Sequence, residues 1–273
     1  MNVAPALAQA AALGLERLDA QLLLLHALGR DPSQRAWLLA HDTDPIASAV
    51  ADHFLALCKR RSLGEPVAYL TGRKEFFGLA LGVDSRVLVP RPDTETLVEW
   101  ALELAPQGGS VIDLGTGSGA IALALKQRRQ DLQVEAVDIS ADALSVAQAN
   151  ACALGLDVNM RLACWLEGAG GGHDLIVSNP PYVATGDPHL AALGHEPALA
   201  LEAGPDGLRD IRTIIAQAPG CLRPAGWLLL EHGWNQSAEV RALLAAAGFA
   251  AVTSRTDLAG IERCSGGKWP ELG

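Results

Sequence analysis

The sequence Ser110-Val111-Ile112-Asp113-Leu114-Gly115-Thr116-Gly117-Ser118-Gly119 joins a short apolar run to three glycines. The apolar run, residues 110–114, is typical of a buried strand, and residues 120–129 follow a helical pattern. Glycines between a strand and a helix allow a tight turn and let a ligand come close to the backbone. The N-terminus of the following helix favours negative charge. The stretch therefore predicts a β–α unit that binds a nucleoside cofactor.

Strands and helices alternate over the rest of the chain from this unit onward. We predict further strands at residues 134–138, 158–163, 174–178, 226–232 and 249–254, and helices at residues 141–154, 208–222 and 238–247. This order predicts an α/β fold with a doubly wound, mostly parallel, Rossmann-like sheet that carries helices on both faces. Such sheets bind ligands at the carboxyl ends of their strands, so the residues that follow each strand are the candidates for chemistry.

The N-terminal part of the chain has a different, purely helical pattern. Leucines recur at three- and four-residue spacing over residues 15–25, and short helices are expected at residues 37–39 and 45–61. Between residues 64 and 92, four glycines separate apolar residues as in a β-hairpin. We therefore predict three parts: a small all-helical domain at residues 1–72, a β-hairpin linker at residues 73–90 and the α/β domain at residues 91–273.

Composition and charge narrow the class of protein. The chain has 273 residues, of which 49% are hydrophobic, and this suffices for a large domain with a smaller one. Its formal net charge is -10, which argues against a broad surface that follows nucleic-acid phosphates.

The cysteines and the apolar segments indicate a reduced, cytoplasmic protein. Five cysteines are scattered without a C-x-x-C pair, as expected of thiols rather than disulfides or zinc ligands. The apolar N-terminus has no basic residues before it, so no signal peptide is expected, and no apolar run suits a bilayer span. The histidines show no metal spacing, and we predict no metal.

The second strand of the α/β domain ends in Asp138, where an acid would meet ribose hydroxyls. The spacing Gly115-x-Gly117-x-x-Ala120 also fits the dinucleotide fingerprint, so a nicotinamide-dependent oxidoreductase is a competing interpretation. Asp113, directly before the glycine loop, suits an ammonium group better than a pyrophosphate. S-adenosylmethionine has an ammonium, a ribose and an adenine in an order that matches these residues, and we predict it as the cofactor.

Asn179-Pro180-Pro181-Tyr182 follows the predicted strand at residues 174–178. Prolines have no N–H and restrict the residue before them, so the segment is stiff. It can present the Asn179 side chain and the Pro180 carbonyl as fixed acceptors, and Tyr182 adds a flat ring. An amide or aromatic NH2 group fits such a holder, although these four residues alone leave a proline-rich loop with a core tyrosine equally open.

Together these motifs resemble the class I S-adenosylmethionine-dependent methyltransferases that act on nitrogen. Further segments narrow the likeness: Gly-Arg-Lys-Glu-Phe at residues 72–76, Pro-Arg-Pro-Asp-Thr-Glu at residues 90–95, and Glu-His-Gly-Trp at residues 231–234. With them, nearly the whole chain resembles the release factor glutamine methyltransferases, the HemK/PrmC family. Asn-Pro-Pro-Tyr is shared with adenine and guanine methyltransferases, whereas the segment at residues 90–95 is far more specific.

The resemblance implies methyl transfer to the side-chain amide nitrogen of the glutamine in the Gly-Gly-Gln loop of peptide chain release factors, with S-adenosylhomocysteine as the product. The cofactor residues it implies are Asp113, Gly115, Thr116, Gly117, Ser118, Gly119, Asp138, Trp165 and Asn179. The substrate residues are Asn179, Pro180, Pro181 and Tyr182, of which Asn179, Pro180 and Tyr182 are catalytic. The helical domain would bind the protein substrate, and no membrane or direct nucleic-acid contact is expected.

One departure from the family pattern concerns the adenine. The family commonly has an acid directly before the tryptophan, within reach of the adenine amino group, but here that residue is Cys164, a weak hydrogen-bond partner. We expect adenine recognition to rest on stacking by Trp165 and on backbone contacts.

Three other functions remain as alternatives. The first is a DNA or RNA base methyltransferase, which the acidic charge disfavours. The second is the oxidoreductase, supported only by the glycine spacing. The third is a non-catalytic protein that binds the cofactor, disfavoured because residues 179–182 are intact.

Overall fold

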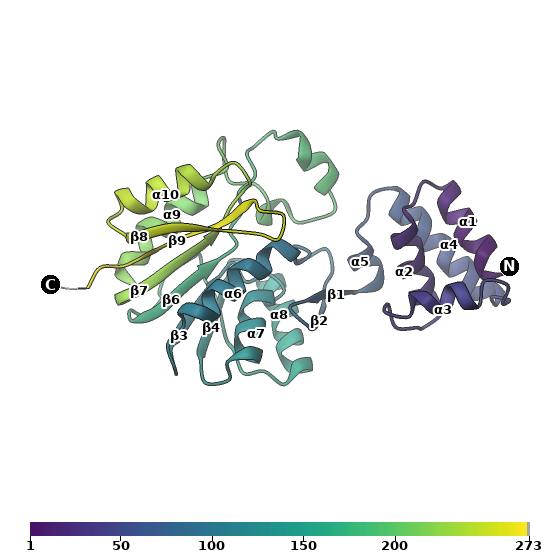
Figure 1. The fold of residues 1–273 in the computed structure, drawn as a ribbon, viewed down its shortest axis with the longest axis horizontal. Coiled ribbons are helices and arrows are strands. Elements are labelled where there is room, and N and C mark those ends of the chain that lie inside the picture. Colours follow the sequence, from purple (N-terminus) through teal and green to yellow (C-terminus); the bar gives the residue numbers. More distant parts are fainter. Residues whose placement is uncertain (272–273) are drawn as a thin grey trace. The chain divides into compact units, whose positions relative to one another are not determined.

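The computed structural model describes residues 1–271, which fall into two compact units, one of residues 1–73 and one that begins at Lys74 (Figure 1). Among the described residues no helix is long and apolar enough to cross a membrane.

The first unit is a bundle of short helices. They are α1 (Val3–Ala12), α2 (Arg17–Ala27), α3 (Arg35–Ala40), α4 (Ser48–Ser62) and α5 (Val67–Thr71). Apolar residues of α2 and α4, such as Leu24 and Phe54, form its core without exposure to solvent. The predicted all-helical character is confirmed, but the extended structure expected from residue 64 is wrong over α5. There Pro66 stands directly before the helix, where its fixed φ and missing N–H are tolerated.

A hairpin follows the helical bundle, as predicted. Its strands are β1 (Arg73–Phe76) and β2 (Leu79–Gly82), which pair in a two-stranded sheet. The two residues between them, Phe77 and Gly78, have φ angles of 51° and 83°. Positive φ at both positions is typical of the tight turn that matches the twist of a hairpin.

Seven strands of the second unit form one sheet within the described residues. They are β3 (Ser110–Leu114), β4 (Gln133–Asp138), β5 (Asn159–Leu162), β6 (His173–Ser178), β7 (Leu222–Glu231), β8 (Ala250–Thr256) and β9 (Glu262–Lys268). Their order is β5-β4-β3-β6-β7-β9-β8, in which β3 to β7 pair in parallel and β9 is antiparallel to both neighbours. The predicted doubly wound, mostly parallel sheet is therefore confirmed.

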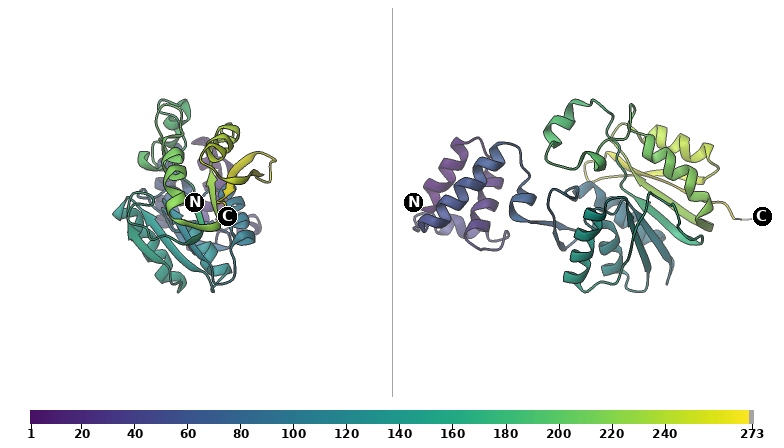
Figure 2. Two further views of the ribbon diagram at one scale, coloured as in Figure 1. Left: turned by 90° about the vertical axis from the view of Figure 1, so that its left-hand side faces the viewer. Right: turned by 180° about the vertical axis from the view of Figure 1, so that it is seen from behind.

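Helices cover both faces of this sheet (Figures 1 and 2). They are α6 (Glu95–Leu104), α7 (Ala120–Arg128), α8 (Ala141–Leu154), α9 (Arg209–Gln217) and α10 (Ser237–Ala246), with short 3₁₀ turns η1 (Pro92–Thr94), η2 (Pro188–Leu193), η3 (Ala198–Ala200) and η4 (Ala218–Gly220). In Figure 1, α9 and α10 lie on one side of the sheet, and α6, α7 and α8 lie on the other. The segment with η2 and η3, green in Figure 2, extends from β6 as a long loop.

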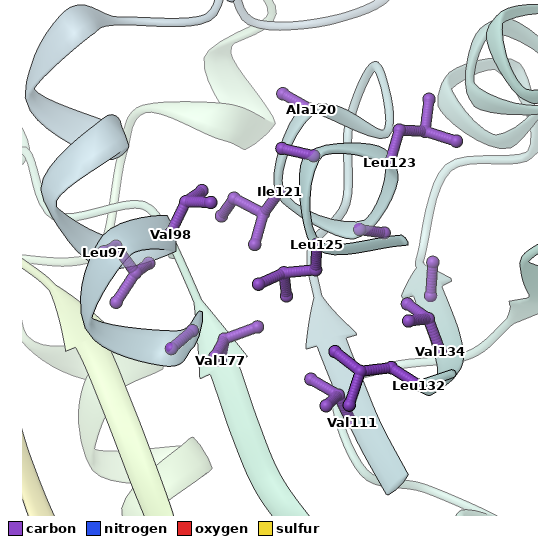
Figure 3. Packing of buried hydrophobic residues seen from close by; sticks show 14 of the residues in the cluster. Leu97, Val98, Val111, Ala120, Ile121, Leu123, Leu125, Leu132, Val134 and Val177 are labelled. Carbon is purple, nitrogen blue, oxygen red and sulfur yellow. The ribbon is translucent and has the colours of Figure 1, made fainter. Parts of the chain in front are cut away.

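The alternation of strand side chains divides the core into two clusters. Val111 of β3 and Val177 of β6 pack with α6 and α7 in the cluster of Figure 3. Their neighbours Ile112 and Ile176 belong to a second cluster with α9 and α10. Successive residues of a strand point to opposite faces, so these strands are apolar on both, as parallel sheets covered by helices require.

One strand of the second unit, β9, was not predicted. The strand expected last in the sheet, at residues 249–254, is followed by β9, which lies between β7 and β8. The glycines in β9 have a low strand propensity, so the sequence does not indicate a strand there. Close packing accounts for the presence of glycine. A Cβ atom on Gly266 would lie 2.5 Å from Leu229 Cδ2 and 3.0 Å from Trp100 Cη2.

Candidate active site

The sheet brings the two motifs of the sequence to one point. The chain runs from β3 outward to β5 and then returns to β6 on the other side of β3, so β3 and β6 flank the place where the strand order reverses. Leu114 at the end of β3 pairs with Ser178 at the end of β6, and the Ser178 hydroxyl donates to the Leu114 carbonyl at 2.7 Å. The glycine loop and Asn179 therefore begin side by side, at the position where open α/β sheets bind ligands.

The glycine loop has left-handed backbone conformations, which favour glycine, and lies close to Trp165 and Asp138. Gly115 has a φ of 70°, and a Cβ atom there would lie 3.3 Å from the Trp165 ring. The Gly117 N–H donates to Asp138 Oδ2 at 2.9 Å, which ties the loop after β3 to the end of β4. Burial raises the pKa of Asp138, and backbone N–H groups oppose the shift.

Asp113 lies behind the glycine loop rather than on its open side. Its side chain is fully buried, and Oδ2 accepts from the Thr116 hydroxyl at 2.6 Å and the Ala122 N–H at 3.2 Å. Burial raises the pKa of Asp113 to about 7. Its other oxygen, Oδ1, has no hydrogen-bond partner among residues 1–271 and keeps acceptor capacity for a donor at the loop.

A cavity of about 310 Å³ opens over the glycine loop. Five of the predicted cofactor residues line it: Gly115, Gly117, Asp138, Trp165 and Asn179. Pro181, a predicted substrate residue, lines it as well. Its volume falls in the range of small-molecule sites. The other predicted cofactor residues, Asp113, Thr116, Ser118 and Gly119, do not line it; they support the loop from behind.

The cavity has apolar walls that suit a flat base. Trp165 takes the left-handed conformation, with a φ of 49°, and its ring lies against the glycine loop. Ile139 is 55% exposed and Leu199 is 60% exposed, and both line the cavity. The sequence analysis did not identify Ile139, although an apolar residue directly after an acid at the end of a strand is a recognisable signal. Together with Asp138, these walls fit the ribose and adenine of S-adenosylmethionine.

A second, smaller cavity of about 100 Å³ adjoins the first. Asn179 lines both, whereas Tyr182 and Arg91 line only the smaller one. Pro180 is buried and lines neither. Asn179 therefore stands between a space of nucleoside size and a space that holds a smaller group.

The orientation of the Asn179 side chain is set by a residue of the segment at 90–95. Asn179 Nδ2 donates to the Thr94 hydroxyl oxygen at 3.1 Å. Thr94 is 4% exposed and belongs to η1. Since the NH2 group is engaged, the carbonyl oxygen Oδ1 is the atom of Asn179 that is left to accept a hydrogen bond. The sequence analysis quoted Thr94 within its motif but gave it no role.

Two further residues of that segment act on the surrounding loops. Arg91 forms an ion pair with Glu196, whose buried carboxylate also accepts from the Val89 N–H at 3.1 Å. Glu95 Oε1 accepts from the Phe77 N–H at 3.0 Å. The first contact fastens the long loop after β6 to the segment before η1, and the second fastens the hairpin to α6.

Beneath Tyr182 lies a buried carboxyl group, that of Glu231. The Tyr182 hydroxyl donates to Glu231 Oε1 in a long contact of 3.5 Å, and Oε2 has no partner among residues 1–271. Burial raises the pKa of Glu231 to about 7, partly offset by the Thr94 hydroxyl. Burial also raises the pKa of Tyr182, which therefore stays protonated near neutral pH. Glu231 belongs to the Glu-His-Gly-Trp segment of the sequence, but nothing local gave it a role.

Stability should depend on pH through Glu231. Below pH 4.5 the Glu231 carboxyl group is protonated in the folded and in the unfolded protein. Between pH 4.5 and 7 the folded protein keeps this proton, whereas the unfolded protein loses it. Its contribution to the free energy of unfolding thus falls as pH rises, by about 3 kcal/mol in total. Glu231→Gln removes this dependence, so the stability of the variant relative to wild type should increase from pH 5 to pH 8. Urea unfolding at several pH values measures it, and parallel curves for the two proteins would contradict the assignment.

His232, the residue after Glu231, is satisfied within the core. It is fully buried, Nδ1 donates to the Gly233 carbonyl at 3.0 Å, and Nε2 pairs with the Ser265 hydroxyl at 2.8 Å. Burial lowers its pKa, so it is neutral. In the described part of the chain, no group of three or more histidine, cysteine, aspartate or glutamate side chains could hold a metal ion.

Comparisons with known proteins agree on one family. Residues 92–196 match the methyltransferase small domain, and residues 3–72 match the PrmC N-terminal domain. A release factor glutamine methyltransferase of Xylella fastidiosa is 50% identical over 271 residues, which cover 97% of this chain and 98% of that relative. A relative of the same name in Bordetella pertussis is 50% identical over 263 residues, 93% of this chain and 95% of the relative. A solved methyltransferase structure from Pyrococcus furiosus, 18% identical, covers 78% of this chain and 98% of its own with a TM-score of 0.56, a likeness of fold.

Proposed function

We propose that this chain, which belongs to the release factor glutamine methyltransferase family, transfers a methyl group from S-adenosylmethionine to the side-chain amide nitrogen of a glutamine in peptide chain release factors. The observation that supports the proposal is the position of Asn179, a residue that lines both the larger and the smaller cavity. A residue in that place can hold an acceptor nitrogen next to the reactive end of a bound cofactor.

S-adenosylmethionine supplies an electrophilic methyl group on a sulfonium centre. The open side of Gly115 and Gly117 would hold its methionine end, and the Asp138 carboxylate would accept from the ribose hydroxyls. Ile139 and Trp165 would enclose the adenine between their side chains. Thr116, Ser118 and Gly119 would keep the loop in shape, and buried Asp113 would act from behind the loop, where its Oδ1 keeps acceptor capacity.

The smaller cavity would take the glutamine side chain. An amide nitrogen is a poor nucleophile because its lone pair is delocalised into the carbonyl group. Asn179 Oδ1 would accept one N–H of the substrate. The Pro180 carbonyl would accept the other once substrate binding exposes it, since Pro180 lines neither cavity in this structure. Two such hydrogen bonds would fix the plane of the amide and favour positive charge on nitrogen as it develops. Tyr182 would pack on the flat amide, and Pro181 would close the wall toward the cofactor.

The proton balance requires no base among these residues. Bound S-adenosylmethionine would supply the methyl group, its carbon–sulfur bond breaking as the bond to the substrate nitrogen forms, and the surplus proton on that nitrogen would pass to water. The raised pKa of Tyr182 means that its hydroxyl stays protonated, so a structural role suits it. Asn179 orients the substrate and takes no proton.

The orientation of Asn179 should depend on the Thr94 hydroxyl. Thr94→Val keeps the shape of the side chain but leaves the Asn179 NH2 group without its acceptor, so the amide can rotate. We expect kcat to fall about tenfold, with little change in the dissociation constant of S-adenosylhomocysteine. Thr94→Ser, which keeps the hydroxyl, should stay near wild type. Steady-state kinetics and calorimetry measure both, and equal losses in the two variants would show that the hydroxyl is not the reason.

The partner and the place of the reaction follow from the same proposal. The helical unit would bind the release factor, with residues 1–72 as a substrate-binding domain, residues 73–90 as a hairpin linker and residues 91–273 as the catalytic domain. The match of residues 3–72 to the PrmC N-terminal domain supports this division. The cytoplasm is the proposed location, because all five cysteines are free thiols.

Methyl-labelled S-adenosylmethionine tests the proposal against its competitor. The chain would be incubated with purified release factor, with a release factor whose Gly-Gly-Gln glutamine is changed to alanine, and with DNA or RNA. We expect label on the first substrate only. Label on nucleic acid alone would instead establish a base methyltransferase, the alternative that Asn-Pro-Pro-Tyr leaves open.

A further inference from the structure

Recognition of the adenine amino group is the part of the site that the sequence motifs leave unexplained. Cys164 lines the larger cavity, directly before Trp165, but a thiol is a weak hydrogen-bond acceptor. Burial raises its pKa, and the nearby carboxylates of Glu167 and Asp210 raise it further. The thiol therefore stays neutral and offers no charge to an amino group.

Helix α9 packs against the loop that carries Cys164. The Leu166 N–H of this loop donates to Gln217 Oε1 of α9 at 3.1 Å. Leu166 also shares an apolar cluster with Ile211 and Ile214 of α9, and Trp165 packs against that cluster. The last residue of α9 thus bonds to this loop, and the first two residues of α9, Arg209 and Asp210, line the cavity together with Cys164 and Trp165.

Asp210 lies in the first turn of α9 and lines the same cavity. Its side chain is 11% exposed, and Oδ2 accepts from Arg209 Nη2 at 2.8 Å. The second contact between the two side chains, from Arg209 Nε to Oδ1, is long at 3.5 Å. A carboxylate can accept about four hydrogen bonds, so Asp210 retains acceptor capacity toward the cavity.

Only one other acidic residue lines this cavity among the described residues, Asp138. Its two oxygens accept from the N–H groups of Gly117 and Ser140, both at 2.9 Å, at the carboxyl end of β4. The two carboxylates therefore belong to different elements. Asp138 stands with the glycine loop, at the proposed ribose end, and Asp210 stands with the loop of Cys164 and Trp165, at the proposed adenine end.

We propose that Asp210 accepts a hydrogen bond from the exocyclic amino group of adenine and so selects an adenine cofactor. Asp210 would thereby take over the role of the acid that stands at position 164 in the family pattern, where this chain has Cys164. The inference rests on the proposed function, since it takes the larger cavity as the site of S-adenosylmethionine. A buried carboxylate stabilises a hydrogen-bond donor at this position and repels an oxygen. The cavity should therefore bind a 6-amino purine more tightly than a 6-oxo purine.

The probe pair is S-adenosylhomocysteine and its deaminated analogue S-inosylhomocysteine, which has a carbonyl oxygen in place of the amino group. Dissociation constants of both are measured by calorimetry on the full chain, without any turnover. A hydrogen bond to a charged group predicts that wild type prefers the amino compound by about 10- to 100-fold. Asp210→Asn has nearly the same shape but can also donate to a carbonyl, so its preference should fall at least about tenfold.

Glu167→Gln is the matched control. Glu167 is exposed, does not line the cavity, and also places a negative charge near Cys164. Its removal should leave the ratio of the two dissociation constants unchanged. A second variant, Cys164→Asp combined with Asp210→Asn, puts a carboxylate back on the same wall and should restore preference for the amino compound.

The outcomes separate the two levels of the proposal. If wild type binds S-adenosylhomocysteine and Asp210→Asn keeps the wild-type ratio, the role of Asp210 is wrong while the proposed cofactor stands. If wild type binds neither compound, the proposed cofactor fails and the inference with it. Circular dichroism melting of each variant shows whether it is folded. If Asp210→Asn does not fold, Asp210→Ser decides in its place: a loss of the preference for the amino compound supports the role of Asp210, and the wild-type ratio overturns it.

Discussion

Asn179→Ala is expected to lower kcat by about 100- to 1000-fold while the dissociation constant of S-adenosylhomocysteine stays close to wild type. In the proposed complex the side chain would accept from the reacting nitrogen, and Thr94 holds it at 3.1 Å, so its loss would remove an oriented acceptor at the point where the two cavities meet. In the same proposal cofactor affinity would depend mainly on the glycine loop and the walls of the larger cavity. Single-turnover kinetics with saturating substrate, together with calorimetry, separate the two effects.

The matched control is Asn159→Ala. Asn159 is an exposed asparagine at the start of β5 and lines neither cavity, so its removal should leave both constants unchanged. If Asn179→Ala turns over as fast as wild type at saturation, Asn179 does not hold the reacting amide and the proposed site is wrong.

Gly207→Ala is expected to lower both stability and activity, although Gly207 lines neither cavity. Gly207 has a φ of 71°, and a Cβ atom there would lie 2.3 Å from the Tyr182 carbonyl oxygen and 2.8 Å from Gln236 Nε2. Gln236 Nε2 in turn donates to that carbonyl at 3.1 Å. The backbone that carries Tyr182 must therefore move, and residues 179–182 are too stiff to absorb the change. We expect a loss of about 3 kcal/mol in the free energy of unfolding from strain and overpacking, with kcat reduced at least about tenfold.

Gly204→Ala isolates the steric part of this effect. Gly204 lies in the same loop with a φ of 79°, but the nearest atom to an added Cβ atom would be Arg209 Cβ at 3.4 Å. It should cost only the left-handed strain, about 1 kcal/mol, and leave kcat near wild type. Denaturant unfolding and kinetics on the pair provide the comparison; equal costs at the two positions would mean that contact with Tyr182 is not the cause.

Local sequence signals were sufficient to predict where the glycine loop, Asp138 and Asn179 lie in the fold. Asp138 ends a strand, and the glycine loop and Asn179 each follow one. Each of these strands could be predicted from its own residues. The order of strands and helices predicts a parallel sheet, whose carboxyl ends meet at one edge. Ile139 also lies at the end of a predicted strand, and it could have been identified from its place directly after Asp138.

Residues that act through tertiary contacts could not be placed from local pattern. Thr94 is 85 positions from Asn179, and Glu231 is 49 positions from Tyr182. Asp210 is an acid at the start of a helix, where charge commonly favours the helix dipole, so nothing local marks it as part of a cavity wall. Such roles depend on how α9, η1 and β7 pack around the motifs.

Site-resolved mass spectrometry of a release factor is the most direct test of the central claim. The purified chain would be incubated with S-adenosylmethionine and release factor, in parallel with the Asn179→Ala variant, and the release factor would then be digested and sequenced by fragmentation. We predict one added methyl group on the side-chain amide of the Gly-Gly-Gln glutamine with wild type, and almost none with the variant. A release factor that stays unmodified at this glutamine, although the same preparation of the chain binds S-adenosylhomocysteine, would contradict the account.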